Sequence, residues 1–200
     1  VERVDLSKRP FTLEVAGIEE YRVTAEALII ATGAQAKWLG LASEKRLAGY
    51  GVSACATCDG FFFREQHVLV VGGGDTAMEE ATYLTKHAKR VTVVHRREDF
   101  RASAIMVKRA QENPKIDWLL NTAIEEILGE PGKIGVQGAR IKNLKSGAVE
   151  TITCNGVFVA IGHQPNTDLF KGQLDMDENG YLLLPGKHTA QTATKIPGVF

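Results

Sequence analysis

Two cysteines separated by two residues, Cys55 and Cys58, are the first group in this sequence that could do chemistry. In a C-x-x-C segment the two sulfurs lie close enough to close a small ring, and one thiol can acquire a lowered pKa and act as a thiolate nucleophile. The pattern therefore indicates thiol–disulfide exchange. Two alternatives stay open, an inert pair and a structural zinc site. A zinc site would need four ligands, and the chain offers only Cys154 and five scattered histidines besides the pair, so we expect no metal.

Asp59 directly follows this cysteine pair. Opening a disulfide leaves thiolates that must be protonated, so a neighbouring carboxyl group could donate and accept that proton. The alternative is that Asp59 is a helix-capping or turn carboxylate. The third cysteine, Cys154, lies between Thr153 and Asn155 at the end of an expected strand and is predicted to be a buried or turn thiol.

The second group is a glycine-rich turn that begins with Gly72 and matches the dinucleotide fingerprint G-x-G-x-x-G/A. In that pattern Gly72 allows the tight turn, Gly74 lets the backbone approach a pyrophosphate, and Ala77 permits close packing of the helix on the strand. The phosphates then lie at the helix N-terminus. The alternative is a merely structural glycine turn. The position between a buried strand and a helix favours nucleotide binding.

A third group, His95, Arg96, Arg97 and Arg101, follows the next expected strand. An NAD site would place an acidic residue there to bind the ribose 2′-hydroxyl. Guanidinium groups at that place suit a 2′-phosphate, so the sequence favours NADP. Residues 86–101 hold six Lys or Arg and two acids in a chain of net charge 0. The alternative is a solvated face neutralised by those two acids, Glu98 and Asp99.

The two chemistries need a carrier between them. NADPH gives up a hydride, whereas a disulfide is opened by electrons from a group that can form an adduct with sulfur. We therefore expect a flavin to take part.

Hydrophobic patterning places these groups on an alternating series of strands and helices. The fold class expected is α/β, with a Rossmann-like three-layer domain that includes a β-meander. We predict early strands over 11–15 and from Tyr21 through 27–31, then strand 67–71, helix 75–86, strand 91–94, helix 103–112 and strand 116–120. The meander is predicted over 124–128, 139–144, 149–153 and 157–161.

Composition limits the partners and the compartment. The 200 residues are 44% hydrophobic and 24% charged with a net charge of 0, which predicts neither nucleic-acid nor membrane binding. The apolar runs are strand-sized, far short of the roughly 20 residues that a membrane span needs. Three cysteines favour a reducing compartment, and we expect a cytoplasmic protein. Because the chain begins at Val1 and ends at Phe200 without a helix stop or polar tail, we expect both ends to be cuts through a longer protein.

Four segments together, 54–64, 72–80, 95–101 and 160–166, closely resemble the low-molecular-weight, bacterial-type thioredoxin reductases, in that family's order. The resemblance implies that residues 34–165 are an NADPH domain inserted between partial segments of an FAD domain of similar fold, 1–33 and 166–200. Two family elements are absent from the chain, the N-terminal FAD fingerprint and a C-terminal Gly-Asp segment. The resemblance thus implies an inactive fragment of an enzyme that is a homodimer when intact.

The resemblance also implies roles for individual residues. Electrons would pass from NADPH through FAD to the Cys55–Cys58 disulfide and on to thioredoxin, with Cys58 facing the flavin, Cys55 attacking thioredoxin and Asp59 as acid and base. The implied cofactor-binding residues are Thr32 and Gly33 for the flavin and Gly72, Gly74, Asp75, Thr76, His95, Arg96, Arg97, Arg101, Ile161 and Tyr181 for NADP. Two alternatives remain: a peroxiredoxin-linked or other NADPH-dependent flavoprotein disulfide reductase, and a non-catalytic NADP-binding redox sensor.

Overall fold

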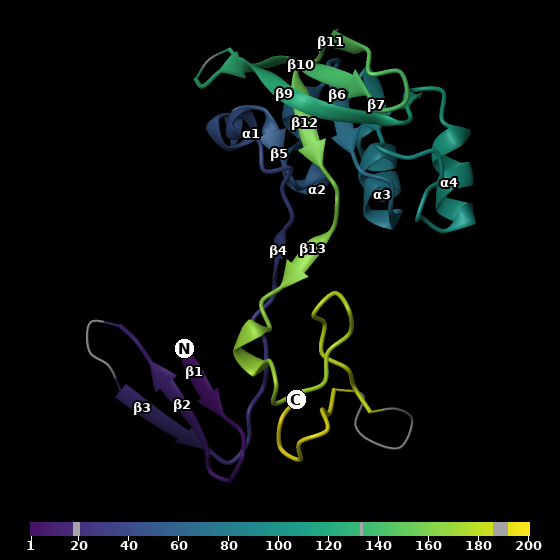
Figure 1. Ribbon diagram of the computed structural model, residues 1–200. Coiled ribbons are helices and arrows are strands. Elements are labelled where there is room, and N and C mark those ends of the chain that lie inside the picture. The colour runs from purple at the N-terminus through teal and green to yellow at the C-terminus, as the bar shows by residue number, and fades with distance from the viewer. Residues whose placement is uncertain (18–20, 133, 186–191) are drawn as a thin grey trace. The chain divides into compact units, whose positions relative to one another are not determined.

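The computed structural model describes residues 1–17, 21–132, 134–185 and 192–200. The chain forms two compact units (Figure 1). Unit 1 comprises Val1–Gln35 and His163–Phe200, and unit 2 comprises Ala36–Gly162. The long middle segment of the chain thus forms one unit, and the two segments that flank it in the sequence form the other.

A five-stranded parallel sheet forms the centre of unit 2. The expected α/β class is therefore confirmed. Its strands, in spatial order, are β5 (Val52–Ser53), β12 (Gly156–Val159), β6 (His67–Val71), β7 (Arg90–Val94) and β8 (Ile116–Leu119).

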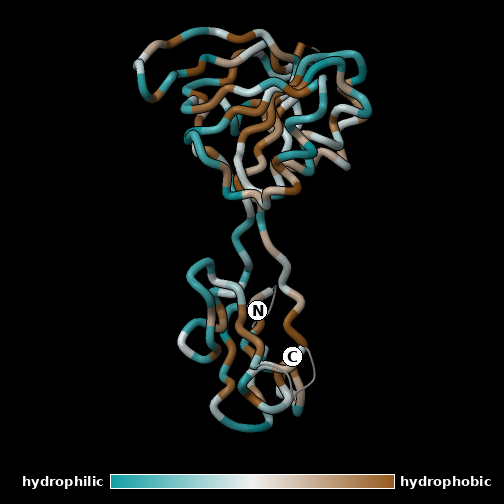
Figure 2. Tube along the Cα trace, turned by 90° about the vertical axis from the view of Figure 1, so that its right-hand side faces the viewer, coloured by the Kyte–Doolittle hydropathy of each residue, from teal (hydrophilic) through white to brown (hydrophobic). Residues whose placement is uncertain are grey.

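Side chains on both faces of this sheet are buried. On β6, Val68 and Val70 belong to one apolar cluster, whereas Leu69 and Val71 belong to another on the opposite face. A strand covered on both faces needs no polar side, which is why the sequence here is a continuous apolar run. Figure 2 shows the hydrophobic segments concentrated in the middle of unit 2.

Helices cover the first face of the sheet. Helix α3 (Asp75–Leu84) buries Ala77, Met78, Ala81 and Leu84 against it, and α4 (Ala104–Gln111) packs beside α3. The Lys115 ammonium group donates to the carbonyl oxygens of Thr85 and Ala88 and so satisfies the C-terminal end of α3. Among the described residues no helix is long and apolar enough to cross a membrane.

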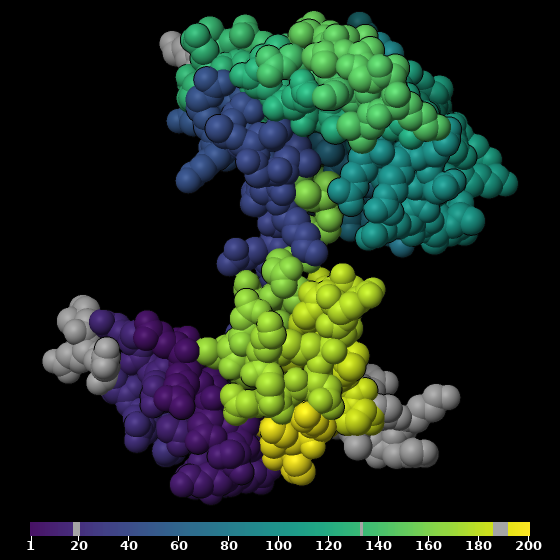
Figure 3. Space-filling view, viewed as in Figure 1, coloured from purple at the N-terminus to yellow at the C-terminus, as the bar shows by residue number. Residues whose placement is uncertain are grey.

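An antiparallel sheet and a short helix cover the second face. The sheet consists of β9 (Thr122–Glu130), β10 (Gly135–Asn143) and β11 (Val149–Thr153), and the helix is α1 (Ala42–Leu47). The green atoms of this layer form an outer surface of unit 2 in Figure 3. Helices, parallel sheet and antiparallel sheet together make the expected three layers.

The prediction that residues 157–161 are a fourth meander strand is wrong. Strand β12 joins the parallel sheet between β5 and β6, and all four of its residues are buried. A short apolar run looks the same in either sheet, because its pairing partners lie far away along the chain.

Unit 1 contains a small antiparallel sheet of β1 (Arg3–Asp5), β2 (Phe11–Val15) and β3 (Tyr21–Ala25), with a 3-10 turn, η2 (Asp168–Phe170). The prediction that the third strand runs on to Ala31 is wrong, because β3 ends at Ala25. Leu28 instead pairs in parallel with Val199. Two further short strands, β4 (Ala34–Ala36) and β13 (His163–Pro165), pair with each other.

Candidate functional site

The candidate site lies at the carboxyl edge of the parallel sheet in unit 2. From β6 the chain runs through α3 to β7 and through α4 to β8, whereas β12 and β5 lie on the other side of β6. The strand order therefore reverses between β6 and β12, and ligands of open α/β sheets bind outside the carboxyl ends at such a point. The segments that follow β5, β6, β7 and β12 carry, respectively, the cysteine pair, the glycine turn, the arginines and Ile161.

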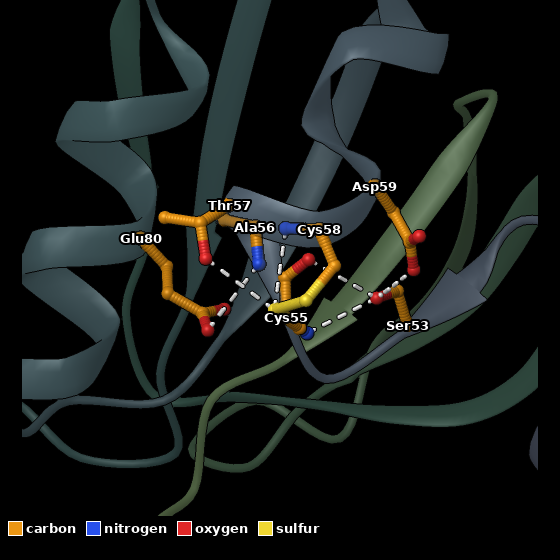
Figure 4. Close-up of a disulfide and its surroundings, with 7 residues drawn as sticks. All are labelled: Ser53, Cys55, Ala56, Thr57, Cys58, Asp59 and Glu80. Carbon is orange, nitrogen blue, oxygen red and sulfur yellow. Dashed lines mark hydrogen bonds between the residues drawn. A yellow bond between two sulfur atoms is a disulfide. The ribbon is translucent and has the colours of Figure 1, made fainter.

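The two cysteines form a disulfide at the start of α2 (Ala56–Asp59), with an S–S distance of 2.04 Å (Figure 4). Cys55 is the N-terminal capping residue of α2, and its sulfur accepts a hydrogen bond of 3.2 Å from the Cys58 backbone N–H. The Thr57 hydroxyl lies 3.4 Å from the same sulfur. Cys55 is half-buried and Cys58 is exposed. The pair is thus held in a turn whose donors point at the Cys55 sulfur.

Ser53, at the end of β5, links the cysteine turn to Asp59. Its hydroxyl group donates to Asp59 Oδ2 at 2.6 Å and accepts from the Cys55 backbone N–H at 3.0 Å. Ser53 is 7% exposed, whereas Asp59 is half-buried and lines a hollow of about 330 Å³ that also contains Phe62. A carboxyl group next to Cys58 in the sequence that lines a hollow can exchange protons with solvent in that hollow, although neither cysteine lines it.

Glu80, on α3, approaches the same turn from the opposite side in Figure 4. Its Oε1 atom accepts from the Ala56 backbone N–H at 3.5 Å. Its Oε2 atom is buried and has no hydrogen-bond partner among the described residues. Burial raises the pKa of Glu80, and the bond from Ala56 lowers it by a smaller amount.

The three glycines of the turn between β6 and α3 differ in the space around them. Neighbouring atoms lie close to Gly72 and Gly73, whereas the space beside Gly74 is open. A Cβ atom on Gly72 would lie 2.3 Å from the Ala160 carbonyl oxygen, and one on Gly73 would lie 2.2 Å from the His95 ring. A Cβ atom on Gly74 would meet nothing within 4 Å. The first two glycines are required by the packing of the turn, whereas the space beside Gly74 is free.

Helix α3 begins directly after this space. Gly74 is its N-terminal capping residue, and no side chain caps it. Asp75 is turned away, because its Oδ1 atom accepts from both the backbone N–H and the hydroxyl of Ser103, at 2.8 and 2.9 Å. Thr76 is half-buried. Uncapped N–H groups at the start of a helix can bind an anion.

The His95 ring packs against Gly73 of the glycine-rich turn. His95 is 8% exposed, its ring is stacked on Phe100 with centroids 5.2 Å apart, and its Nε2 atom lies 3.0 Å from the Asp99 carbonyl oxygen. These contacts make His95 part of the packing under Gly73. Its contact with a nucleotide stays a prediction.

The three arginines after β7, Arg96, Arg97 and Arg101, are all exposed. None of them forms an ion pair with another residue in the described part of the chain. Glu98 pairs with Lys145 at 2.8 Å instead, and this partner lowers the pKa of Glu98. The alternative that Glu98 and Asp99 neutralise the arginines therefore gains no support, since neither acid forms an ion pair with them in the described part of the chain.

The remaining predicted cofactor-binding residues lie apart from this cluster along the chain. Ile161 is exposed and follows β12 in unit 2. Thr32 and Gly33 belong to unit 1, where their carbonyl oxygens accept from the Asn166 side chain and backbone at 3.0 and 2.9 Å. Tyr181 also belongs to unit 1, and its backbone N–H donates to Asp177.

Cys154 does not belong to the site. It is fully buried in the apolar cluster under the antiparallel layer, which confirms the prediction of a buried thiol, and burial raises its pKa to about 12. Across the described ranges no three His, Cys, Asp or Glu residues gather as a metal site would require. His188, one of the five histidines weighed for zinc, lies outside the described residues.

Two residues of this site, Ser53 and Glu80, had no role in the sequence-based prediction. Ser53 lies two residues before Cys55, a spacing typical of a side chain that bonds a nearby backbone N–H, so a local pattern could have indicated it. Glu80 comes from α3, 24 residues along the chain from Ala56. Only the packing of α2 against α3 brings it to the disulfide.

Comparison with known proteins gives one family and a consistent set of relatives. A family model described as pyridine nucleotide-disulphide oxidoreductase matches residues 1–200. The chain is 50% identical over 200 residues to a protein named thioredoxin reductase from Rickettsia felis, and 50% identical over 205 residues to one from Escherichia coli O157:H7. It covers 63% and 62% of their lengths, and both matches cover 100% of the chain.

Solved structures agree with the sequence relatives. The structure of thioredoxin reductase from Giardia duodenalis matches with a TM-score of 0.84 and 48% identity, over 100% of this chain and 63% of that one. The enzyme of the same name from Streptococcus pyogenes matches with a TM-score of 0.80 and 39% identity, over 100% and 62%. The chain thus spans less than two thirds of the length of the relatives it matches.

Proposed function

The chain belongs to the pyridine nucleotide-disulphide oxidoreductase family, and we propose that it is part of a thioredoxin reductase. In this enzyme electrons pass from NADPH through FAD to the Cys55–Cys58 disulfide and on to thioredoxin. The observation that carries this proposal is the placement of a disulfide and an open glycine turn at one edge of one parallel sheet. Thioredoxin is proposed as the substrate because the relatives are thioredoxin reductases by name.

The residues after β6 and β7 fit NADPH. The free space beside Gly74 and the uncapped start of α3 suit a pyrophosphate, with Thr76 alongside. Arg96, Arg97 and Arg101 carry charges that no described acid pairs with, and a 2′-phosphate is a matching partner for guanidinium groups. We also propose that His95, Asp75, Ile161 and Tyr181 contact this nucleotide.

Unit 1 does not fit a flavin nucleotide by itself. Among its described residues no glycine-rich turn opens a helix, since it contains short strands, loops and one 3-10 turn. We propose only that Thr32 and Gly33 contact FAD, and that residues 1–33 and 166–200 are partial segments of an FAD domain around an NADPH domain of residues 34–165. When bound, the two cofactors supply a hydride and then an electron pair at the disulfide.

The chain's own residues perform the thiol chemistry. When two electrons enter, the Cys55–Cys58 bond breaks, and Asp59 holds or gives the proton that one thiolate takes up. The Cys55 thiolate then attacks the disulfide of the partner, forming a mixed disulfide and releasing one partner thiolate. The Cys58 thiol then returns its proton to Asp59, and the Cys58 thiolate attacks the Cys55 sulfur, which re-forms the internal disulfide and releases the second partner thiolate.

The local geometry supports this division of roles. The Cys58 N–H and the Thr57 hydroxyl both lie at the Cys55 sulfur, where they would stabilise a thiolate nucleophile. Cys58 is the more exposed residue, which suits the sulfur that receives electrons from a group outside unit 2. We further propose a homodimer when intact, a reducing cytoplasmic location, no nucleic-acid or membrane partner, and no turnover by these 200 residues alone.

Trapping of a mixed disulfide tests the proposal. In Cys58→Ser, Cys55 can still attack the disulfide of thioredoxin, but no Cys58 sulfur is present to resolve the mixed disulfide. This variant should therefore form a covalent adduct with oxidised thioredoxin. Cys55→Ser is the matched control and should form little adduct. Equal trapping by both variants would contradict the assigned roles, and no adduct with Cys58→Ser would contradict the reductase function and favour a redox sensor.

A further inference from the structure

One half-buried carboxyl group beside the disulfide, that of Glu80, has no part in the proposed reaction. The Glu80 carboxyl group reaches from α3 to the first turn of α2, where Oε1 accepts from the Ala56 N–H at 3.5 Å. Ala56 follows Cys55 directly, so the carboxyl group lies one peptide unit from the attacking cysteine (Figure 4). The other carboxyl oxygen, Oε2, is buried without a hydrogen-bond partner among the described residues.

The Oε1 atom of Glu80 stabilises the turn through Ala56, whereas the burial of Oε2 costs folding energy without a hydrogen bond in return. A buried carboxylate oxygen that lacks a hydrogen bond is unfavourable, and an amide or apolar side chain would fill the same space at lower cost. No Lys, Arg or His of the described chain forms an ion pair with Glu80. Its negative charge is therefore not neutralised locally, and a partly buried charge is screened less by solvent than an exposed one.

We propose that Glu80 is a positioning residue that holds the first turn of α2 and, by its charge beside Cys55, lowers the reduction potential of the Cys55–Cys58 pair. This inference rests on the proposed function, because it requires the pair to cycle between disulfide and dithiol. Reduction places negative charge on sulfur, and a carboxylate nearby disfavours that charge. The thiolate that forms is then more basic and more nucleophilic, which suits a pair that passes electrons onward.

Equilibration with dithiothreitol measures this potential in the 200-residue chain without any cofactor. The Cys55–Cys58 bond breaks, the Cys58 sulfur becomes a thiol and the Cys55 sulfur a thiolate in equilibrium with its thiol, while dithiothreitol gives up two electrons, closes its own disulfide and releases its two protons to these sulfurs and to the buffer. The fraction reduced is read by alkylation and mass spectrometry at pH 8.

Three variants separate charge from structure. Glu80→Gln keeps an acceptor for the Ala56 N–H and removes the charge, and Glu80→Ala removes both. Glu79→Gln is the matched control, because it removes the same charge from the neighbouring, exposed position of α3. We expect both Glu80 variants to raise the equilibrium constant for reduction roughly three- to tenfold, tenfold being about 30 mV for this two-electron couple, and Glu79→Gln to leave it unchanged.

The possible outcomes distinguish this inference from the function on which it rests. Equal constants for the wild type and both Glu80 variants would overturn the inference while the wild-type pair still cycles. A rise of the same size in Glu79→Gln would overturn it too, since a general loss of surface charge would then explain the shift. A wild-type pair that does not cycle reversibly would contradict the proposed function itself.

Discussion

Two carboxyl groups, Asp59 and Glu80, flank the cysteine turn, and their different surroundings suit them to different proposed roles. Asp59 is fixed by the Ser53 hydroxyl at 2.6 Å and lines a hollow, so it can exchange protons with water. Glu80 is half-buried, and its buried Oε2 atom has no hydrogen-bond partner in the described part of the chain. In the proposed reaction the same functional group carries a proton on one side of the turn and provides a fixed charge on the other.

Removal of the Ser53 hydroxyl tests how Asp59 is held. In Ser53→Ala, Asp59 loses its donor and the Cys55 N–H loses its acceptor. We expect the prereduced chain to reduce oxidised thioredoxin about tenfold more slowly, since a lost hydrogen bond at a charged group costs about 1.5 kcal/mol. Stopped-flow fluorescence measures this rate. Ser103→Ala is the control, because that hydroxyl bonds Asp75 instead; an equal loss there would refute the special role of Ser53.

The buried thiol gives a prediction with a definite pH sign. Burial raises the pKa of Cys154 from 9.0 to about 12. The folded chain therefore keeps this proton at pH 8, and iodoacetamide should label two cysteines in the reduced native chain and three after unfolding. Because the folded pKa is the higher one, this contribution to the free energy of unfolding is present below pH 9 and is lost as the pH rises toward 12. Three labels in the native chain would show that Cys154 is accessible.

At the scale of the elements, the turn between β6 and α3 divides its glycines into packing and binding positions. Gly72 has a φ of 154° and touches Ala160, whereas Gly74 has an ordinary backbone conformation with open space beside it. The same substitution should therefore affect the stability of the fold at Gly72 and nucleotide binding at Gly74.

Alanine at each glycine tests this division. Gly74→Ala should leave the melting temperature unchanged and weaken NADPH binding about tenfold or more, because the methyl group occupies the pyrophosphate's approach. Gly72→Ala should destabilise the fold by about 2 kcal/mol, or about 4–8 °C. Calorimetry of unfolding and of binding measures both. Full NADPH affinity in Gly74→Ala would contradict the placement of the phosphates.

The sequence predicts what is local in these elements and misses what is distant. Strand β6, the glycine turn, helix α3 and strand β7 lie within 28 residues, from His67 to Val94, so their pattern suffices to predict a βαβ unit. Strand β12 and the Leu28–Val199 bridge depend on partners far along the chain. Glu80 is the same case within the site, since its meeting with Ala56 depends on two helices packing together.

At the scale of the whole molecule, the two ends of unit 2 lie next to each other. The Lys37 N–H donates to the Gly162 carbonyl oxygen at 2.9 Å, so the chain enters and leaves this unit at one place. A domain whose termini are adjacent can be inserted into another domain without disturbing its fold. Unit 2 thus meets this requirement for an inserted domain, and the binding of a nucleotide to it is a proposal.

Unit 2 expressed alone tests this independence. Residues 36–162 contain the whole parallel sheet, both apolar clusters and the disulfide. We expect this segment to unfold cooperatively within a few degrees of the 200-residue chain and to bind NADPH with an affinity within about threefold, since its core is its own. A segment without a cooperative transition would show that unit 2 depends on the rest of the chain.

The most direct test of the central claim is a calorimetric titration of the 200-residue chain with NADPH and, in parallel, with NADH. The account predicts that NADPH binds at least about tenfold more tightly, and that Arg96→Ala/Arg97→Ala removes this preference, because each lost bond from an arginine to the 2′-phosphate is worth about 1.5–3 kcal/mol. Equal affinities for the two nucleotides, or an unchanged preference in the double variant, would contradict it.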